Sequence, residues 1–140
     1  MIAYIDTSVV LRVILRAPNA LADWEDIEQY MSSTLLRVEC WRTLERMRLA
    51  EHKPANEISI RKQAVEDLML AVDLFDVTNR ILQRAAEPLI VPLKTLDAIH
   101  LATAIACRNQ GLSDLAFATH DAQLARAARA LNFPVLAYGN

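Results

Sequence analysis

Four acidic residues occur at points where a short apolar run ends or a helical pattern begins. They are Asp6, Glu39, Asp97 and Asp121. In a parallel α/β sheet, side chains at the carboxyl ends of neighbouring strands converge on one crevice. Carboxylates gathered there repel each other unless a cation neutralises them, and Mg²⁺ or Mn²⁺ binds oxygen ligands of this kind. The pattern therefore predicts a divalent-metal site for phosphate chemistry, with these four residues as its catalytic and metal-binding groups.

Two hydroxyl residues accompany the acids. Ser8 follows Asp6 by two positions, and Thr119 precedes Asp121 by two positions. A hydroxyl at such a place can hydrogen-bond a ligand carboxylate and fix its orientation. We therefore expect Ser8 and Thr119 to support the acidic site.

Arginines follow one of the acids along a predicted helix. Glu39, Arg42 and Arg46 are spaced at i, i+3 and i+7, so they share one helix face. Guanidinium groups bind phosphates through paired hydrogen bonds, and this face therefore predicts a track for an RNA backbone. Arg12 and Arg16 form a similar pair on an earlier helix, and Arg12 is a further candidate for RNA contact.

The composition limits the classes of function. The 140 residues fit one domain spanning 1–140, and 54% hydrophobic residues are enough to form a core. Only two glycines occur, which excludes a glycine-rich phosphate loop and with it Walker-type NTPases and dinucleotide-binding proteins. The net charge of −2 argues against a general nucleic-acid binder but suits a nuclease whose acids hold cations.

Cysteine use and hydropathy indicate the compartment. Cys40 and Cys107 fall inside helical patterns, so buried free thiols are expected rather than a disulfide. The chain begins directly with a strand, and no apolar run approaches the roughly 20 residues that a membrane helix needs. We therefore expect a cytoplasmic protein that does not bind membranes.

Short apolar runs alternate with amphipathic helical patterns along the chain. Strands are predicted at residues 2–5, 30–33, 72–77, 114–119 and 134–137. Helices are predicted from residue 8 onward and at residues 20–30, 35–50, 58–70, 78–86, 95–109 and 121–131. Ser8, Thr78 and Thr95 are expected to cap three of them. The alternation predicts an α/β fold with a mostly parallel sheet covered on both sides, and the strand at 72–77 is expected near the sheet edge.

Four segments of the chain resemble the acidic motifs of PIN-domain ribonucleases. They are IAYIDTS at residues 2–8, the segment from Ser33 to Glu39, LDAIHLATA at residues 96–104 and ATHDAQLA at residues 118–125. The order and spacing are similar to those of the VapC toxins of prokaryotic toxin–antitoxin pairs, and the resemblance spans essentially the whole chain. It implies a three-layer α/β/α PIN-like domain with a mostly parallel central sheet of four to five strands.

The resemblance also implies functional roles. Four acids would be metal ligands or would organise the ligands, with two hydroxyl residues in support: Asp6, Glu39, Asp97, Asp121, Ser8 and Thr119. It further implies a homodimer that is inhibited by a VapB-like antitoxin. We therefore predict a Mg²⁺- or Mn²⁺-dependent endoribonuclease that hydrolyses RNA phosphodiester bonds, the toxin of a type II toxin–antitoxin system.

Three other functions remain open at this point. One is a PIN nuclease that is not a toxin, and another is a non-catalytic interaction module with the same fold. The third is a phosphatase-like phosphoryl hydrolase with an aspartyl nucleophile at Asp6. The usual pattern for that chemistry has a second aspartate two residues later, where this chain has Ser8.

Each candidate also has an ordinary structural interpretation. Any of the acids can be a helix cap or a surface charge, and Glu39 can form a helical ion pair with Arg42. His100 lies on an apolar helix, which favours a packed, hydrogen-bonded histidine over a general base. Helical spacing favours core or partner contacts for Trp24 and Trp41 over stacking on bases.

Overall fold

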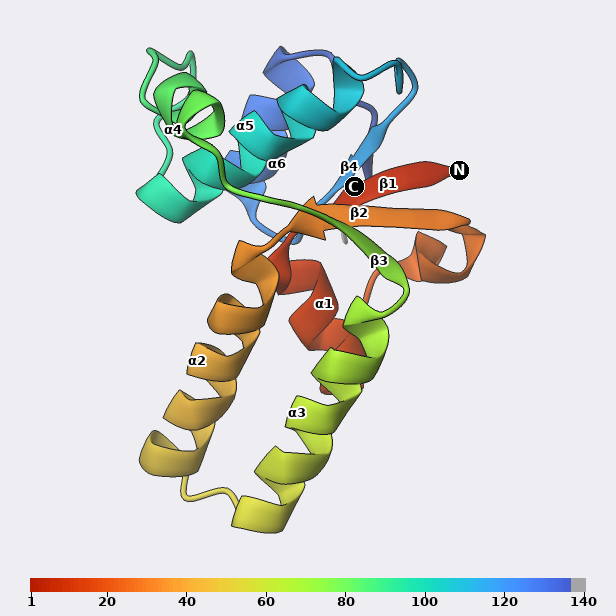
Figure 1. The fold of residues 1–140 in the computed structure, drawn as a ribbon. Coiled ribbons are helices and arrows are strands. Elements are labelled where there is room, and N and C mark those ends of the chain that lie inside the picture. Colours follow the sequence, from red (N-terminus) through yellow and green to blue (C-terminus); the bar gives the residue numbers. More distant parts are fainter. Residues whose placement is uncertain (137–140) are drawn as a thin grey trace.

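Five parallel strands form one sheet in the computed structural model, which describes residues 1–136 (Figure 1). The strands are β1 (Ile2–Ile5), β2 (Gln29–Ser33), β3 (Val72–Phe75), β4 (Ala116–Ala118) and β5 (Val135–Leu136). Their order across the sheet is β3-β2-β1-β4-β5, so β1 is central and β3 lies at an edge, as the sequence predicts. Because all four pairings are parallel, every carboxyl end faces the same edge of the sheet.

Helices cover both faces of this sheet. They are α1 (Thr7–Ile14), α2 (Leu35–Ala50), α3 (Ala55–Met69), α4 (Asn79–Ala85), α5 (Thr95–Arg108) and α6 (Ala122–Ala130). The first three lie on one side of the sheet and the last three on the other (Figure 1). The predicted three-layer α/β/α fold with a mostly parallel sheet of four to five strands is therefore confirmed.

The central strand shows why the sheet must be covered twice. Ala3 and Ile5 pack into the core formed with α1, α2 and α3, whereas Tyr4 packs into the core formed with α5 and α6. Successive side chains of a strand point to opposite faces, so an unbroken apolar run needs an apolar layer on each side. The residue that follows this run, Asp6, is thereby placed between the two layers at the carboxyl edge.

One predicted helix is wrong. The helix within residues 20–30 is only the short 3₁₀ helix η1 (Ala22–Asp26), Ile27 has already returned to extended backbone, and β2 begins at Gln29. The apolar residues Leu21, Trp24 and Ile27 are three apart, a spacing that a 3₁₀ turn of 3.0 residues satisfies as well as an α-helix does. The chain must also be extended by Gln29, which pairs with Ile2 of β1.

Two predicted caps are also wrong. The N-cap of α1 is Asp6 rather than Ser8, because the Asp6 side chain accepts a hydrogen bond from the Val9 amide. The N-cap residue of α5 is Lys94, and Thr95 is the first helical residue. Thr78 caps α4 as predicted, with its hydroxyl 3.2 Å from the Ile81 amide.

The other predicted helices and strands are present, with some of their boundaries shifted. Helix α3 begins at Ala55, three residues before its prediction, and the last strand is described only as far as Leu136, so Ala137 lies outside the described residues. Cys40 and Cys107 are buried free thiols. Within the described residues, every helix is too short or too polar to cross a lipid bilayer.

Candidate active site

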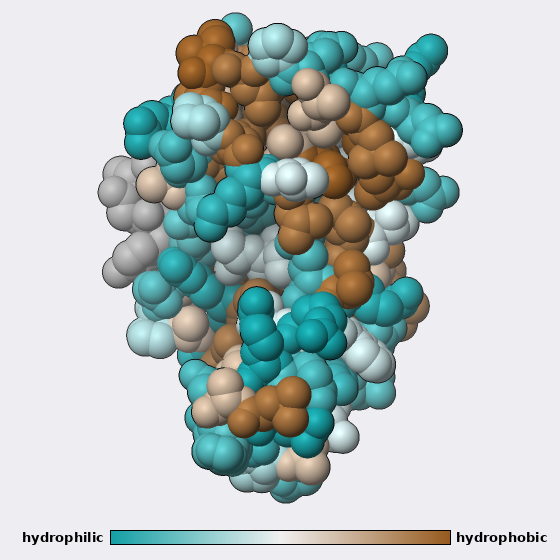
Figure 2. All heavy atoms as spheres, turned by 90° about the vertical axis from the view of Figure 1, so that its left-hand side faces the viewer, coloured by the Kyte–Doolittle hydropathy of each residue, from teal (hydrophilic) through white to brown (hydrophobic). Residues whose placement is uncertain are grey.

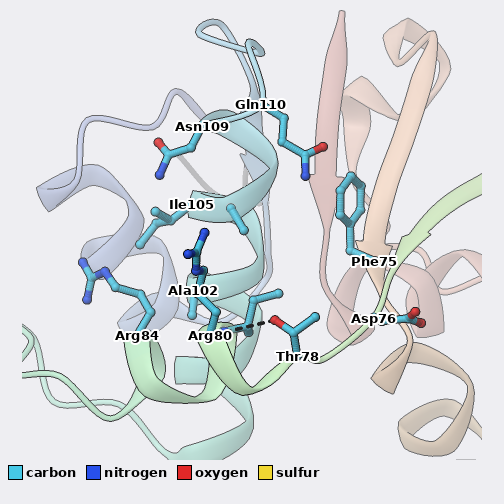
Figure 3. A pocket seen from close by; sticks show the side chains of 11 residues that line it. Phe75, Asp76, Thr78, Arg80, Arg84, Ala102, Ile105, Asn109 and Gln110 are labelled. Carbon is cyan, nitrogen blue, oxygen red and sulfur yellow. Dashed lines mark hydrogen bonds between the residues drawn. The ribbon is translucent and has the colours of Figure 1, made fainter.

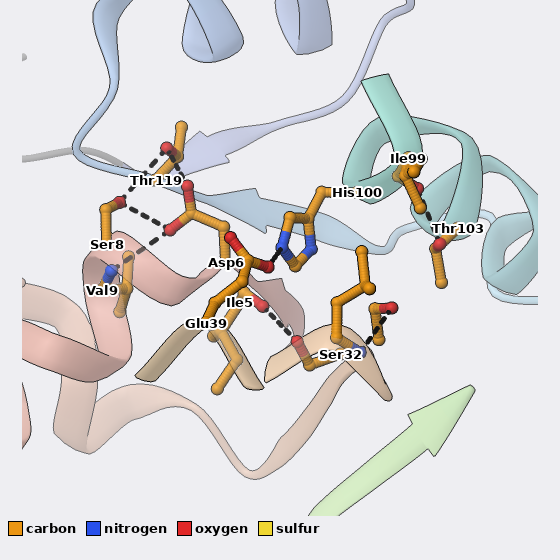
Figure 4. A network of polar contacts seen from close by, with 12 residues as sticks. Ile5, Asp6, Ser8, Val9, Ser32, Glu39, Ile99, His100, Thr103 and Thr119 are labelled. Carbon is orange, nitrogen blue, oxygen red and sulfur yellow. Dashed lines mark hydrogen bonds and ion pairs between the residues drawn. The ribbon is translucent and has the colours of Figure 1, made fainter. Parts of the chain in front are cut away.

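The carboxylate of Asp6 is held by three donors at the carboxyl end of the central strand (Figure 4). Its Oδ1 accepts hydrogen bonds from the Ser8 hydroxyl at 2.6 Å and the Val9 amide at 3.1 Å. Its Oδ2 accepts one from the Thr119 hydroxyl at 2.5 Å. Asp6 is only 4% exposed, so these contacts fix one orientation of a buried carboxylate. The single donor on Oδ2 leaves that oxygen with capacity to bind a cation.

The same hydroxyls connect this carboxylate to the end of β4. The Ser8 hydroxyl accepts the His120 amide at 3.0 Å, and the Thr119 hydroxyl accepts the Asp121 amide at 3.0 Å. Asp6 donates its own backbone amide to the Ala118 carbonyl at 3.2 Å. The neighbouring strands β1 and β4 therefore end in one hydrogen-bonded unit, with both predicted supporting residues in contact with Asp6.

Asp97 and Asp121 approach this unit from two helix starts. Asp97 lies half-buried in the first turn of α5, and Asp121 is the exposed N-cap of α6, with Oδ1 2.8 Å from the Leu124 amide. Both line one open hollow of about 490 Å³, together with Lys94. The positive end of each helix dipole faces this hollow and favours negative charge there.

The electrostatics show that the acids act on one another. Burial raises the pKa of Asp97, and the charges of Asp121, Asp6 and Glu39 raise it further, although His100 opposes them. Burial likewise raises the pKa of Asp6, in spite of the hydrogen bonds that stabilise its ionised form. Two carboxyls whose charge is disfavoured, beside two more carboxylates, form a region that a cation would neutralise.

Glu39 reaches the same edge from α2, on the opposite layer. Its Oε1 lies 2.6 Å from Nε2 of His100 on α5 (Figure 4). Nδ1 of His100 lies 2.7 Å from the Tyr4 hydroxyl. Glu39 also lines a second hollow of about 320 Å³ with Thr7, Arg42 and Arg46. In residues 1–136 the hydrogen-bond partner of Glu39 is His100, and no ion pair joins Glu39 to Arg42.

The four acids do not form a ready-made metal cage. Across the described part of the chain, no three His, Cys, Asp or Glu side chains are grouped closely enough to hold a metal ion together. The donor chemistry nevertheless fits, because carboxylate oxygens are hard ligands and Mg²⁺ retains several waters that bridge longer distances. The structure thus places the predicted acids at one edge and leaves their role in metal binding as a prediction.

Comparison with known proteins places this arrangement in a family. Residues 3–130 match the family model described as the PIN domain. The chain belongs to the PIN-domain family. Among curated proteins it is 31% identical to ribonuclease VapC46 of Mycobacterium tuberculosis, over 96% of this chain and 95% of that protein. It is 33% identical to ribonuclease VapC35 of the same species, over 97% of this chain and 96% of that protein.

Solved structures share the fold at lower sequence identity. The VapBC2 complex of Rickettsia felis, bound to a DNA fragment from its promoter, contains a chain with a TM-score of 0.65 and 14% identity, with 99% of each chain covered. The VapBC-1 complex of nontypeable Haemophilus influenzae contains one with a TM-score of 0.63 and 12% identity, with 100% of each covered. These likenesses establish the three-layer fold of this PIN domain.

The predicted RNA-binding arginines divide into two groups in this PIN domain. Arg42 and Arg46 are exposed on α2 and line the Glu39 hollow, and Arg46 also donates to the Thr43 hydroxyl at 3.0 Å. Arg12 is half-buried, and its Nη1 lies 3.4 Å from the Asn19 carbonyl. The first pair therefore lies beside one of the acids, whereas Arg12 contacts the loop that follows its own helix.

The structure shows the contacts of the histidine and of the two tryptophans that the sequence singles out. His100 is a buried, hydrogen-bonded histidine as predicted, but the sequence did not reveal its partners. Trp24 stacks on Tyr30 with ring centroids 4.6 Å apart. Trp41 is partly exposed, with the Lys62 ammonium 4.7 Å from the centroid of its ring. The position of His100, three residues after Asp97 in an apolar helical pattern, is the signal in the sequence that could have indicated this network.

Another hollow lies away from the acids (Figure 3). It measures about 530 Å³ between α4, α5 and the end of β3, and its lining includes Phe75, Arg80, Arg84, Asn109 and Gln110. None of the four predicted acids lines it. We therefore assign the candidate active site from the chemistry of the carboxylates rather than from the size of a cavity.

Proposed function

We propose that this PIN-domain protein is a Mg²⁺- or Mn²⁺-dependent endoribonuclease and the toxin of a type II toxin–antitoxin pair. The observation that carries the proposal is the set of four carboxylates at one edge of the sheet, where three of them raise the pKa of Asp97. The names of the VapC ribonucleases, matched over nearly the full chain, support the same activity.

The cation would be held by oxygen atoms of the aspartates. Asp6 offers Oδ2, Asp121 offers the oxygen that does not cap α6, and Asp97 offers its carboxylate from the first turn of α5. Glu39 completes the set from the other layer, directly or through water. When bound, Mg²⁺ or Mn²⁺ supplies Lewis-acid activation of water and stabilises the charge that develops on the phosphate.

The chain's own residues then perform three tasks. Ser8 and Thr119 hold the buried Asp6 carboxylate in one orientation before any cation arrives. Arg42 and Arg46, exposed beside Glu39, bind the phosphates of the RNA strand and align it with the acids. The burial of Asp6 limits the access of bulk water to its carboxylate, which strengthens the charge interactions that this carboxylate makes.

The proposal includes two protein partners and a compartment. A VapB-like antitoxin would inhibit the enzyme in the cytoplasm, and a second copy of the chain would form a homodimer. Large apolar side chains remain exposed at Leu82, Ile90 and Leu96, with Ile90 85% exposed. Figure 2 shows apolar residues concentrated in the upper half of one face, while hydrophilic residues cover most of the lower half. Such a surface is suited to protein contacts.

Cleavage of RNA by purified, antitoxin-free protein tests this function. We expect cleavage with Mg²⁺ or Mn²⁺, none in EDTA, and a loss on the order of 100-fold or more for Asp6→Asn, because several kcal/mol of transition-state stabilisation would be lost. Asp73→Asn is the matched control, since Asp73 is an exposed aspartate on β3 whose side chain accepts a hydrogen bond from the side chain of Gln29. Cleavage that survives chelation, or that Asp6→Asn leaves intact, would refute the proposal.

A further inference from the structure

A buried chain of hydrogen bonds crosses from one layer of the fold to the other. It starts at the Tyr4 hydroxyl on β1, passes through both ring nitrogens of His100 on α5 and ends at Oε1 of Glu39 on α2, with steps of 2.7 and 2.6 Å. Tyr4 is 0% exposed and His100 is 1% exposed. We propose that Tyr4 and His100 are positioning residues that fix the orientation of the Glu39 carboxylate. This inference rests on the proposed function, in which Glu39 serves the cation.

The direction of the hydrogen bonds follows from the donors available. A carboxylate only accepts, so the hydrogen between His100 and Glu39 belongs to Nε2 of the ring. Nδ1 can then accept the Tyr4 hydroxyl, and the two rings stand edge to face at a centroid distance of 5.9 Å. Both nitrogens of His100 are thereby engaged, which fixes the plane of its ring as well as its tautomer.

This arrangement leaves one oxygen of Glu39 for a ligand. Oε1 is bonded to His100, and within residues 1–136 no hydrogen bond is found to Oε2. A glutamate side chain loses rotamer freedom when it is held in one position. Here that freedom is already lost in the folded protein, so a ligand that meets Oε2 encounters a pre-organised oxygen.

Packing alone does not account for the network. The His100 ring lies beneath the acidic edge, and its partner Glu39 lines the hollow that also contains Arg42 and Arg46. A histidine needed only to fill space would satisfy its nitrogens with backbone groups, as Thr103 does one turn later with the Ile99 carbonyl at 2.7 Å. Both ring nitrogens instead bind residues that lie 96 and 61 positions away in the chain.

Two amide substitutions at one position separate positioning from packing. In His100→Gln the amide nitrogen can occupy the place of Nε2 and still donate to Glu39. In His100→Asn the shorter amide reaches only the place of Nδ1, so the hydrogen bond with Tyr4 is kept and the one with Glu39 is broken. Both variants put a neutral amide into the same buried site, so each is the other's control for polarity and reduced volume.

The primary measurement is Mn²⁺ binding by titration calorimetry on the folded full-length protein, with thermal unfolding recorded for each variant. We expect His100→Asn to weaken Mn²⁺ binding about 10- to 100-fold, and His100→Gln to weaken it by less than about 10-fold. Tyr4→Phe should give a smaller loss than His100→Asn, because the Nε2 hydrogen bond remains. Equal Mn²⁺ affinities for the Gln and Asn variants would overturn the inference, whatever their stabilities.

A spectroscopic readout distinguishes failure of this inference from failure of the proposed function. In ¹⁵N NMR spectra of the metal-free protein, we expect hydrogen on Nε2 of His100, protected from exchange in the wild type and unprotected in Glu39→Ala. A hydrogen on Nδ1 alone, or protection that Glu39→Ala leaves unchanged, would overturn the positioning role. Protected Nε2 together with absent Mn²⁺ binding and absent RNA cleavage would refute the nuclease while the positioning of Glu39 stands.

Discussion

The substitution Asp97→Asn should stabilise the metal-free protein and destabilise the metal-loaded one. Burial raises the pKa of Asp97, and the charges of Asp121, Asp6 and Glu39 raise it further while His100 lowers it, so the ionised form of Asp97 is disfavoured in the metal-free protein. Two unit charges 4 Å apart repel by about 1 kcal/mol in water. Asp97 is only half-buried and solvent screens each pair, so we take the total relief as about 1 kcal/mol. For a chain of this size that corresponds to a melting temperature raised by roughly 3–5 °C.

Mn²⁺ should reverse the order of stability of the wild type and Asp97→Asn. At a concentration of about 100 times its dissociation constant, a ligand that binds only the folded state stabilises it by about 2.7 kcal/mol. If Asp97→Asn weakens binding by about 100-fold, the variant gains only about 0.4 kcal/mol under the same conditions. The wild type should then be the more stable protein by roughly 1.3 kcal/mol.

The pH dependence has a defined sign. Because the pKa of folded Asp97 lies above its ordinary value of 3.8, the folded state binds this proton more tightly than the unfolded state does. The stability that protonation contributes is fully present below that ordinary value and is lost as the pH rises through the raised pKa. The advantage of metal-free Asp97→Asn should therefore appear as the pH rises above about 4 and be absent below it.

Thermal unfolding in EDTA and in Mn²⁺, from pH 3.5 to pH 8, measures the stabilisation of the metal-free variant, its reversal by Mn²⁺ and its pH dependence. Asp114→Asn is the control, because it removes an exposed aspartate just before β4 and should leave both melting temperatures unchanged. If Asp97→Asn melts no higher than the wild type in EDTA, the repulsion among the acids is too weak to matter. If Mn²⁺ stabilises both proteins equally, Asp97 does not bind the cation.

The arginines of α2 and a buried thiol give two more predictions. Removal of Arg42 or Arg46 by alanine should weaken RNA binding and reduce the salt slope of the affinity by about 0.7 for each phosphate that the protein no longer neutralises. Arg37→Ala is the control in filter binding, because Arg37 is engaged with Glu66 at 2.9 Å, and an equal loss there would contradict the assignment. Burial raises the pKa of Cys40 to about 12, so iodoacetamide at pH 8 should not label it until the protein unfolds; labelling of the native protein would contradict its burial.

Most of the fold could be predicted because most of its local sequence patterns are compatible with only one type of secondary structure. The apolar run at residues 2–5 is too short for a helix and carries no polar residue for a solvent-facing side, which leaves a strand buried on both faces. The segment at residues 20–30 failed because its three-residue spacing fits two helix types, and the pairing of Gln29 with Ile2 decides between them. That pairing joins two residues that are too far apart in the sequence for a local pattern to include both.

Local sequence was enough to place the acids relative to the strand ends and to place Ser8 beside Asp6, whereas the contact of Thr119 with Asp6 joins residues 113 positions apart. Parallel strands carry such residues to a common edge whatever the details of packing. The pairing of Glu39 with His100 rather than with Arg42, and the position of Tyr4 behind both, became known only from the folded chain. Burial leaves each polar group only the partners that packing brings within hydrogen-bond distance, and here these come from elements 61 and 96 residues apart.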